Sequence, residues 1–286
     1  MNSDHMRGLV MVTVGVLVLS PDALIIRLVE ADQWTLLWWR GLLTAIGLAA
    51  YLIFRNGREA GAKVLAIGRL GMLSTPLFAG STILFVTSVS LTTAANTLVI
   101  VSAAPLFAAV FSRLFLGEVV PLRTWFAVVA GVTGIAVIFA DSLGAGSLWG
   151  DLCAVGTAAF LAGHLVVARH ARPVSMVPAV AMSGLLVTAV MTPLAAPFAI
   201  TSRDFVLLLA LGLVIMPISF GLITTGPRYL PAAEVSLIML LEAVFGPLWV
   251  WLAVGEVPAS GTFLGGAVVL ATLITHAVLG LRRSRA

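Results

Sequence analysis

Long apolar runs, separated by charged residues, proline or glycine, dominate the sequence. A bilayer core about 30 Å thick requires roughly 20 apolar residues of helix to cross it. By this measure the sequence predicts ten membrane-spanning helices, at about residues 8–29, 34–54, 66–89, 92–116, 121–141, 148–169, 175–198, 204–226, 231–254 and 260–281. The connections between them are short, so the predicted fold class is an all-α integral membrane protein without a separate soluble domain.

Composition supports this prediction and narrows the classes of function. Hydrophobic residues make up 60% of the chain and charged residues 10%, whereas a soluble domain carries about 25% charged residues. Lipid is therefore the expected partner of most of the surface. The basic residues occur singly at helix ends, which argues against nucleic acid despite the net charge of +4. The single cysteine, Cys153, excludes an internal disulfide and a cysteine-rich metal site, and we expect no metal or cofactor.

The basic residues also predict an orientation. If the N-terminus is cytoplasmic, all of the 16 Lys and Arg residues except Arg27, Arg40 and Arg203 fall at the cytoplasmic side. The cytoplasmic set is Arg7, Arg55, Arg58, Lys63, Arg69, Arg113, Arg123, Arg169, Arg172, Arg228, Arg282, Arg283 and Arg285. Because Lys and Arg accumulate on the cytoplasmic side of membrane proteins, both termini are expected there.

A sequence pattern recurs 138 residues along the chain, from Ala94 to Ala232. The first copy contains Ala94, Ala95, Ile100, Phe107, Leu114, Gly117, Glu118 and Val119. The second contains Ala232, Ala233, Ile238, Phe245, Leu252, Gly255, Glu256 and Val257. This shift is close to half of the 286 residues, so we expect two repeats, 1–143 and 144–286. The alternative is chance similarity between apolar helices.

The number of helices in each repeat predicts how the repeats are oriented. Five helices is an odd number, so the second repeat starts on the opposite side of the membrane. Glu118 is then expected at the cytoplasmic end of its helix and Glu256 at the outer end. Inverted repeats provide two related conformations, each open to one side, which is the basis of alternating access.

Several motifs resemble the EamA-domain halves of the drug/metabolite transporter superfamily. They are Ala94–Glu118 with Pro105 and the closing Leu-Gly-Glu, Ala233–Glu256 with Glu242, the glycine pairs Gly131/Gly134 and Gly265/Gly266, and Arg40. The resemblance covers nearly the whole chain. It implies a ten-helix exporter of the bacterial plasma (inner) membrane, most similar to amino acid and metabolite exporters, including the aromatic amino acid branch. The family's Glu-Pro pair is split, because Ala104 precedes Pro105 and Ala243 follows Glu242.

Glu242 is the deepest acid in the predicted helices and a candidate substrate-cavity residue. Ile238, Phe245 and Trp249 flank it at helical spacing. An acid at this depth is costly and usually faces the bundle interior. It could bind a substrate ammonium, carry a coupling proton, or hold helices together.

Asp22 and Arg40 form a second candidate group. Each lies roughly 10 Å below the outer surface, as judged from about 1.5 Å of rise per helical residue. An ion pair would neutralise both charges in the low dielectric. Arg40 could instead extend to the outer headgroups. We favour a gating or structural role for the pair over substrate contact.

Polar and aromatic residues on other predicted helices complete the candidate cavity. Phe78, Ser81, Thr82 and Phe85 share one helix face, as do Phe160 and His164. Packing or bonding to their own backbone is the alternative role for each. The full set is Glu242, Phe78, Ser81, Thr82, Phe85, Asn96, Phe160, His164, Ser219, Phe220, Phe245 and Trp249, with helix bends expected at Pro105, Pro217 and Pro247.

These patterns favour a secondary transporter that exports small metabolites, most of all amino acids, by alternating access. The alternative is proton-coupled efflux of cationic drugs, with Glu242 as the required anion, or of another metabolite. The chain lacks a nucleotide-binding Gly-x-x-x-x-Gly-Lys motif and the His-Glu-x-x-His and Gly-x-Ser-x-Gly motifs, so neither ATP hydrolysis nor an enzyme is expected. A channel is disfavoured by the duplication. A monomer suffices, although Gly261-x-x-x-Gly265 could pack helices within the chain or in a homodimer.

Overall fold

The computed structural model describes residues 3–117, 122–145, 147–171, 174–225, 229 and 232–284, and within these ranges the chain forms helices and short connections without any strand. Six helical stretches are long and apolar enough to cross a membrane. They are His5–Leu28, Gln33–Leu65, Gly68–Leu91, Ala94–Leu116, Leu148–Ala168 and Ser202–Ile223. Four shorter apolar helices accompany them, at Thr124–Ala140, Val177–Met191, Ile238–Val254 and Ser260–Thr275.

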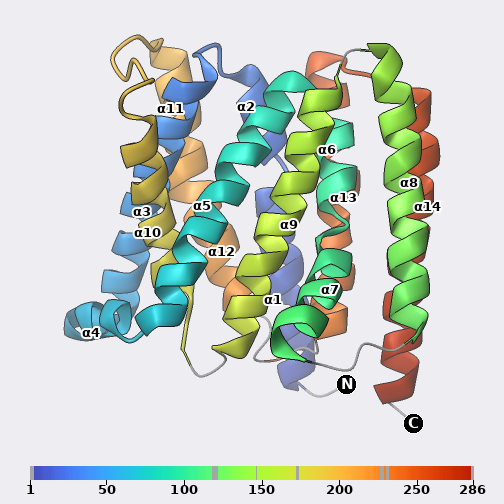
Figure 1. Cartoon of the computed structure of the whole chain (residues 1–286). Coiled ribbons are helices and arrows are strands. Elements are labelled where there is room, and N and C mark those ends of the chain that lie inside the picture. The colour runs from blue at the N-terminus through green and yellow to red at the C-terminus, as the bar shows by residue number, and fades with distance from the viewer. Residues whose placement is uncertain are drawn as a thin grey trace.

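The helices stand side by side, and both chain ends lie at the same end of the bundle (Figure 1). The first half contains α1 (Ser3–Leu19), α2 (Asp22–Leu28), α3 (Gln33–Asn56), α4 (Ala60–Leu65), α5 (Gly68–Leu91), α6 (Ala94–Val101), α7 (Ala104–Leu116) and α8 (Leu122–Ala145). The second half contains α9 (Leu148–His170), α10 (Val177–Met191), α11 (Ser202–Leu209), a π-helical turn (Ala210–Ile215), α12 (Met216–Thr225), α13 (Ala232–Val254) and α14 (Ser260–Ser284).

Two helices predicted to be continuous are interrupted. The predicted helix 8–29 stops at Leu19, and α2 starts again at Asp22 after Ser20 and Pro21. The predicted helix 92–116 stops at Val101, and α7 starts at Ala104 with Pro105 in its first turn. Proline has no N–H and is favoured where a helix begins, so each proline lies at a restart rather than at a bend.

The second half also differs from the predicted helices. In the predicted helix 204–226, a π-helical turn ends two residues before Pro217, whose missing N–H leaves a backbone carbonyl without its usual partner. The predicted helix 175–198 already ends at Met191, because turns containing Pro193 and Pro197 follow. Pro247, in contrast, lies inside a continuous α13.

Glycines allow the closest helix contacts. A Cβ atom on Gly41 of α3 would lie 2.6 Å from the backbone oxygen of Gly184 in α10. A Cβ atom on Gly134 of α8 would lie 2.8 Å from the oxygen of Gly265 in α14. Gly265 therefore packs inside the chain, which is one of the two uses expected for its motif. The largest core cluster includes Val16, Leu37 and Val86 together with Leu208 and Val250, so the two sequence halves share one apolar core.

Candidate functional site

Asp22 and Arg40 form a buried ion pair beside the first helix break. The restart at Pro21 makes Asp22 the first residue of α2, where the helix dipole favours a negative charge. The Arg40 guanidinium donates to both carboxylate oxygens, from Nη1 to Oδ1 and from Nη2 to Oδ2 at 2.8 Å. The side chains are 8% and 6% exposed. The guanidinium also lies 5.8 Å from the centroid of the Phe85 ring, so the pair is held on two sides.

A small cavity of about 40 Å³ lies next to this pair, and Arg40 is part of its wall. Its lining comes from four helical segments and combines a guanidinium, hydroxyls and aromatic rings. The lining residues are Arg40, Gly41, Thr44, Phe78, Thr82, Ser183, Gly184, Val187, Met216 and Phe220. Four of the residues singled out from the sequence thus meet here: Arg40, Phe78, Thr82 and Phe220.

Aromatic contacts fix one wall of the cavity. The Phe78 ring lies edge-on to Phe220, with centroids 5.3 Å apart, and edge-on to His164, with centroids 4.8 Å apart. His164 is buried and its Nδ1 lies 2.8 Å from the Ser74 hydroxyl. His164 is therefore hydrogen-bonded behind the wall and does not line the cavity.

Glu242 belongs to the same electrostatic group as the ion pair. It is half-buried on α13 and interacts electrostatically with both Asp22 and Arg40. Within the part of the chain that the structure describes, its carboxylate forms no hydrogen bond. Seven residues further along α13, Trp249 Nε1 donates to the Ser20 hydroxyl at 2.8 Å. This face of α13 is thus turned toward the break between α1 and α2.

The remaining candidates lie around the cavity rather than in its lining. The hydroxyls of Ser81 and Thr82 donate to the backbone oxygen of Phe78, at 2.8 and 3.1 Å. Phe160 packs over Gly80, at the contact of α9 with α5. The Ser219 hydroxyl is buried and has no hydrogen-bond partner among the described residues. Phe245 is half-buried on α13.

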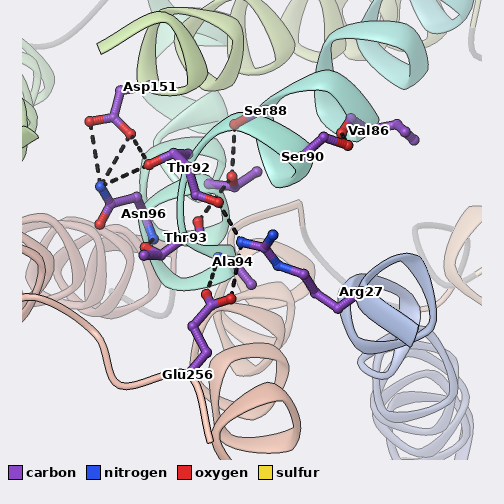
Figure 2. A network of polar contacts seen from close by, with 11 residues as sticks. Arg27, Val86, Ser88, Ser90, Thr92, Thr93, Ala94, Asn96, Asp151 and Glu256 are labelled. Atoms are coloured by element: carbon purple, nitrogen blue, oxygen red, sulfur yellow. Dashed lines mark hydrogen bonds and ion pairs between the residues drawn. The ribbon is translucent and has the colours of Figure 1, made fainter. Parts of the chain in front are cut away.

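Asn96 lies in a polar network at the end of the bundle where α2 ends and α6 begins (Figures 1 and 2). Its Nδ2 donates to Asp151 Oδ1 at 3.1 Å, and the Thr92 hydroxyl donates to the same oxygen at 2.9 Å. The Thr262 hydroxyl donates to Asn96 Oδ1. Asn96 therefore joins α6 to the starts of α9 and α14 and is not part of the cavity.

Glu256 extends this network toward Arg27 of α2, as Figure 2 shows. Glu256 Oε1 accepts the Ala94 N–H at 2.7 Å, and Oε2 lies 3.0 Å from Arg27 Nη2. Arg27 Nη2 also donates to the Thr92 backbone oxygen at 2.5 Å. Glu118, the sequence counterpart of Glu256, lies outside the described residues.

Sequence reasoning missed this network as a site. Asp151 was a usable signal, because it is an isolated acid in the first turn of an apolar helix and is fully buried. The partners of Arg27 and Glu256 could not be found from spacing, since they lie far apart in the chain. Among the described residues, no three His, Cys, Asp or Glu side chains come close enough to hold a metal ion.

Interrupted apolar helices, a buried ion pair beside one interruption and a cavity next to that pair are typical of multi-pass membrane transporters. The model of the EamA-like transporter family matches residues 6–140 and 148–276. The chain therefore belongs to the EamA-like transporter family, whose members are membrane transporters of small molecules rather than enzymes.

One solved structure, described as "Crystal structure of protein", superposes with a TM-score of 0.69 and is 17% identical. The alignment covers 96% of this chain and 98% of that chain. At this identity the likeness concerns the fold alone. No curated protein matches the sequence.

Proposed function

We propose that this protein is a secondary transporter that exports amino acids, broadly or with an aromatic preference, across the bacterial plasma membrane. Export proceeds by alternating access through a central cavity that includes the Arg40 cavity. The observation that carries this proposal is the guanidinium of Arg40 in the wall of a cavity with aromatic and hydroxyl lining. Family membership supports the transporter class.

The chemistry of the cavity favours a carboxylate-bearing solute. A guanidinium has five N–H donors, and Asp22 accepts two of them, so donors remain for a second carboxylate. None of the residues lining the cavity is acidic. A volume of about 40 Å³ admits little more than a carboxylate group. The rest of the solute requires the helices to separate, which is the movement that alternating access provides.

The proposed architecture has ten spans in two inverted repeats, 1–143 and 144–286, with both termini cytoplasmic. Helix packing supports this architecture. Where two helices pack against each other, the helices that correspond to them in the other repeat also pack against each other. The pair α5 with α9 corresponds to α12 with α1, and α7 with α9 corresponds to α13 with α1. The pairs α3 with α10 and α8 with α14 each join a helix to its own counterpart. The internal use of Gly265 supports a monomer as the transporting unit.

Counterflow in proteoliposomes tests the substrate. Vesicles loaded with one amino acid are expected to take up the same labelled amino acid, and a panel defines the preference. A matched pair, phenylalanine and phenethylamine, isolates the carboxylate, and we expect only phenylalanine to exchange. Exchange of another metabolite without any amino acid contradicts the substrate assignment.

Proton-coupled efflux of cationic drugs is the second candidate, and Glu242 favours it. This half-buried acid makes no hydrogen bond with the described residues and could receive a cation. The test is Glu242→Gln, with Glu59→Gln in the exposed turn between α3 and α4 as the control. Loss of dye transport in Glu242→Gln, with dye transport kept in Glu59→Gln, supports the drug-efflux function. Dye transport that continues undiminished in Glu242→Gln removes its main support.

A further inference from the structure

Glu256 connects the second half of the chain to two groups of the first half. One carboxylate oxygen accepts the N–H of Ala94, in the first turn of α6, and the other pairs with Arg27, in the last turn of α2. First-turn N–H groups have no partner within their own helix, and a negative charge is favoured there. One carboxylate therefore joins the ends of two short helices to the α13–α14 connection.

The charged residues of this polar network differ in how firmly they are held. Asp151 is fully buried and accepts from Thr92 and Asn96, which makes it a fixed anchor. Arg27 and Glu256 are 24% and 20% exposed, and Arg27 Nε is buried without a hydrogen-bond partner among the described residues. An ion pair in contact with water is weak and exchanges readily. The Arg27–Glu256 ion pair is thus the contact at this end of the helix bundle that can break and re-form.

Both first-half partners are carried by segments that begin or end at a helix break. Arg27 lies on α2, which follows the Ser20–Pro21 break, and Ala94 lies on α6, which stops before the Ser102–Ala103 break. Such interruptions are where backbone rotation is absorbed when half-helices move. The first residue of α2 is Asp22, the partner of Arg40 in the cavity wall.

From this arrangement we propose that Arg27, Thr92, Ala94 and Glu256 form a latch that closes this end of the solute pathway, and that α2 couples the latch to the Arg40 cavity. The inference rests on the transport function proposed above. When a solute carboxylate binds the remaining donors of Arg40, the guanidinium shifts and carries its partner Asp22 with it. This shift moves α2, withdraws Arg27 from Glu256 and frees the start of α6. The latch closes when the solute leaves Arg40 and the Asp22–Arg40 pair returns to its position in this structure.

Thiol accessibility tests the latch without requiring a known solute. Leu98 is buried on α6 and packs against Gly246 of α13, directly below the latch. In the full-length protein in nanodiscs, with Cys153→Ala, the variant Leu98→Cys reports whether α6 separates from α13. We expect Arg27→Gln and Glu256→Gln each to raise its labelling rate by about five-fold, the effect of losing one partly exposed ion pair. Arg27→Lys, which keeps the charge, is expected to restore slow labelling.

Arg203→Gln is the matched control. It removes a second ion pair between the halves, Arg203–Glu30, whose side chains are 61% and 71% exposed. No change in labelling is expected from it. Equal labelling of folded Arg27→Gln, Glu256→Gln and Arg203→Gln overturns the latch.

The coupling through α2 is tested by a double-mutant cycle of Asp22→Asn with Glu256→Gln. If α2 couples the two pairs, the effects of the two substitutions on the labelling rate are not additive. Additive effects show that the sites are independent and overturn the coupling through α2. A bifunctional thiol reagent joining Arg27→Cys to Glu256→Cys, again with Cys153→Ala, is expected to abolish counterflow. Undiminished counterflow after cross-linking overturns the latch, while absence of counterflow in the unmodified protein contradicts only the proposed function.

Discussion

Asp22 and Arg27 stand on the same seven-residue helix, yet each forms an ion pair with a different part of the chain. Asp22 pairs with Arg40 of α3 in the cavity wall, and Arg27 pairs with Glu256 after α13. Because one short rigid segment carries both charges, a movement that breaks one pair displaces the partner of the other. The break at Ser20 and Pro21 provides the freedom for this movement.

The buried pair predicts a specific pattern of stabilities. Asp22→Asn or Arg40→Gln leaves one charge buried without its partner, at a cost of about 3–5 kcal/mol in the free energy of unfolding. The double variant removes both charges, so we expect it to be more stable than either single variant. Unfolding in detergent, monitored by the exposure of the Cys153 thiol or by the loss of helical signal, measures the stability of each variant. A double variant less stable than both single variants contradicts the prediction.

Close helix contact at Gly41 gives the second prediction. A Cβ atom there would lie 2.6 Å from the oxygen of Gly184 and 2.8 Å from Thr188 Oγ1. Gly41→Ala is therefore expected to destabilise the fold by about 1–3 kcal/mol, because α3 and α10 must separate. Gly61→Ala is the control, since a Cβ atom on Gly61 in α4 would meet nothing within 4 Å. Replacing that helical glycine is expected to be neutral or stabilising by up to about 1 kcal/mol. Thermal unfolding of both variants measures the two changes in stability. Equal stability of Gly41→Ala and Gly61→Ala contradicts the close contact at Gly41.

The all-helical fold could be predicted from hydropathy, because apolar runs of this length form helices in lipid. The interruptions could not. Pro21 and Pro105 are visible in the sequence, but whether a proline bends, ends or starts a helix depends on which neighbouring groups satisfy the freed carbonyls. Pro247 illustrates the point, since α13 continues through it.

The candidate site was also predictable only in part, because the partners of a polar residue depend on which helices lie beside it. Asp22 and Arg40 are expected at the same depth from counting helical rise, and the structure pairs them. Asn96 shows the limit, because its partners Asp151 and Thr262 lie on other helices. A polar residue on a membrane helix signals a partner in the bundle, but spacing along one helix does not say which partner.

Asp32 gives a prediction about pH at the start of α3, outside the apolar span. Its Oδ1 accepts the N–H groups of Trp34 and Thr35, at 3.0 and 3.1 Å. Slight burial raises the pKa of Asp32, but hydrogen bonding from the Thr35 side chain and from the backbone N–H groups of Thr35 and Trp34 outweighs it and holds the pKa below the ordinary value of 3.8. The ionised form is therefore the stabilising one. Its contribution is present above the unfolded-state pKa and is lost as the pH falls through the lower folded-state pKa.

Asp32→Ala is accordingly expected to cost about 1 kcal/mol near neutral pH, the usual value of a helix cap. The stability difference between the two proteins should shrink as the pH falls below the ordinary value of 3.8. Asp32→Asn keeps an acceptor oxygen without the charge and serves as the control, with a smaller loss near neutral pH. A difference between wild type and Asp32→Ala that grows on acidification contradicts the assigned role.

Arg40→Lys separates the ion pair from the proposed carboxylate site. Lysine keeps the positive charge opposite Asp22, so most of the fold stability should remain. An ammonium group has three donors on one atom, whereas a guanidinium can donate a separate pair of N–H groups to each of two carboxylates. We therefore expect Arg40→Lys to weaken amino acid binding by at least about ten-fold, measured as the half-saturating concentration in counterflow. Arg55→Lys on the same helix, whose guanidinium bonds to the exposed Tyr51 hydroxyl, should leave binding unchanged. If Arg40→Lys is as stable as the wild type and binds the amino acid equally well, Arg40 only holds Asp22, and the carboxylate must be recognised elsewhere.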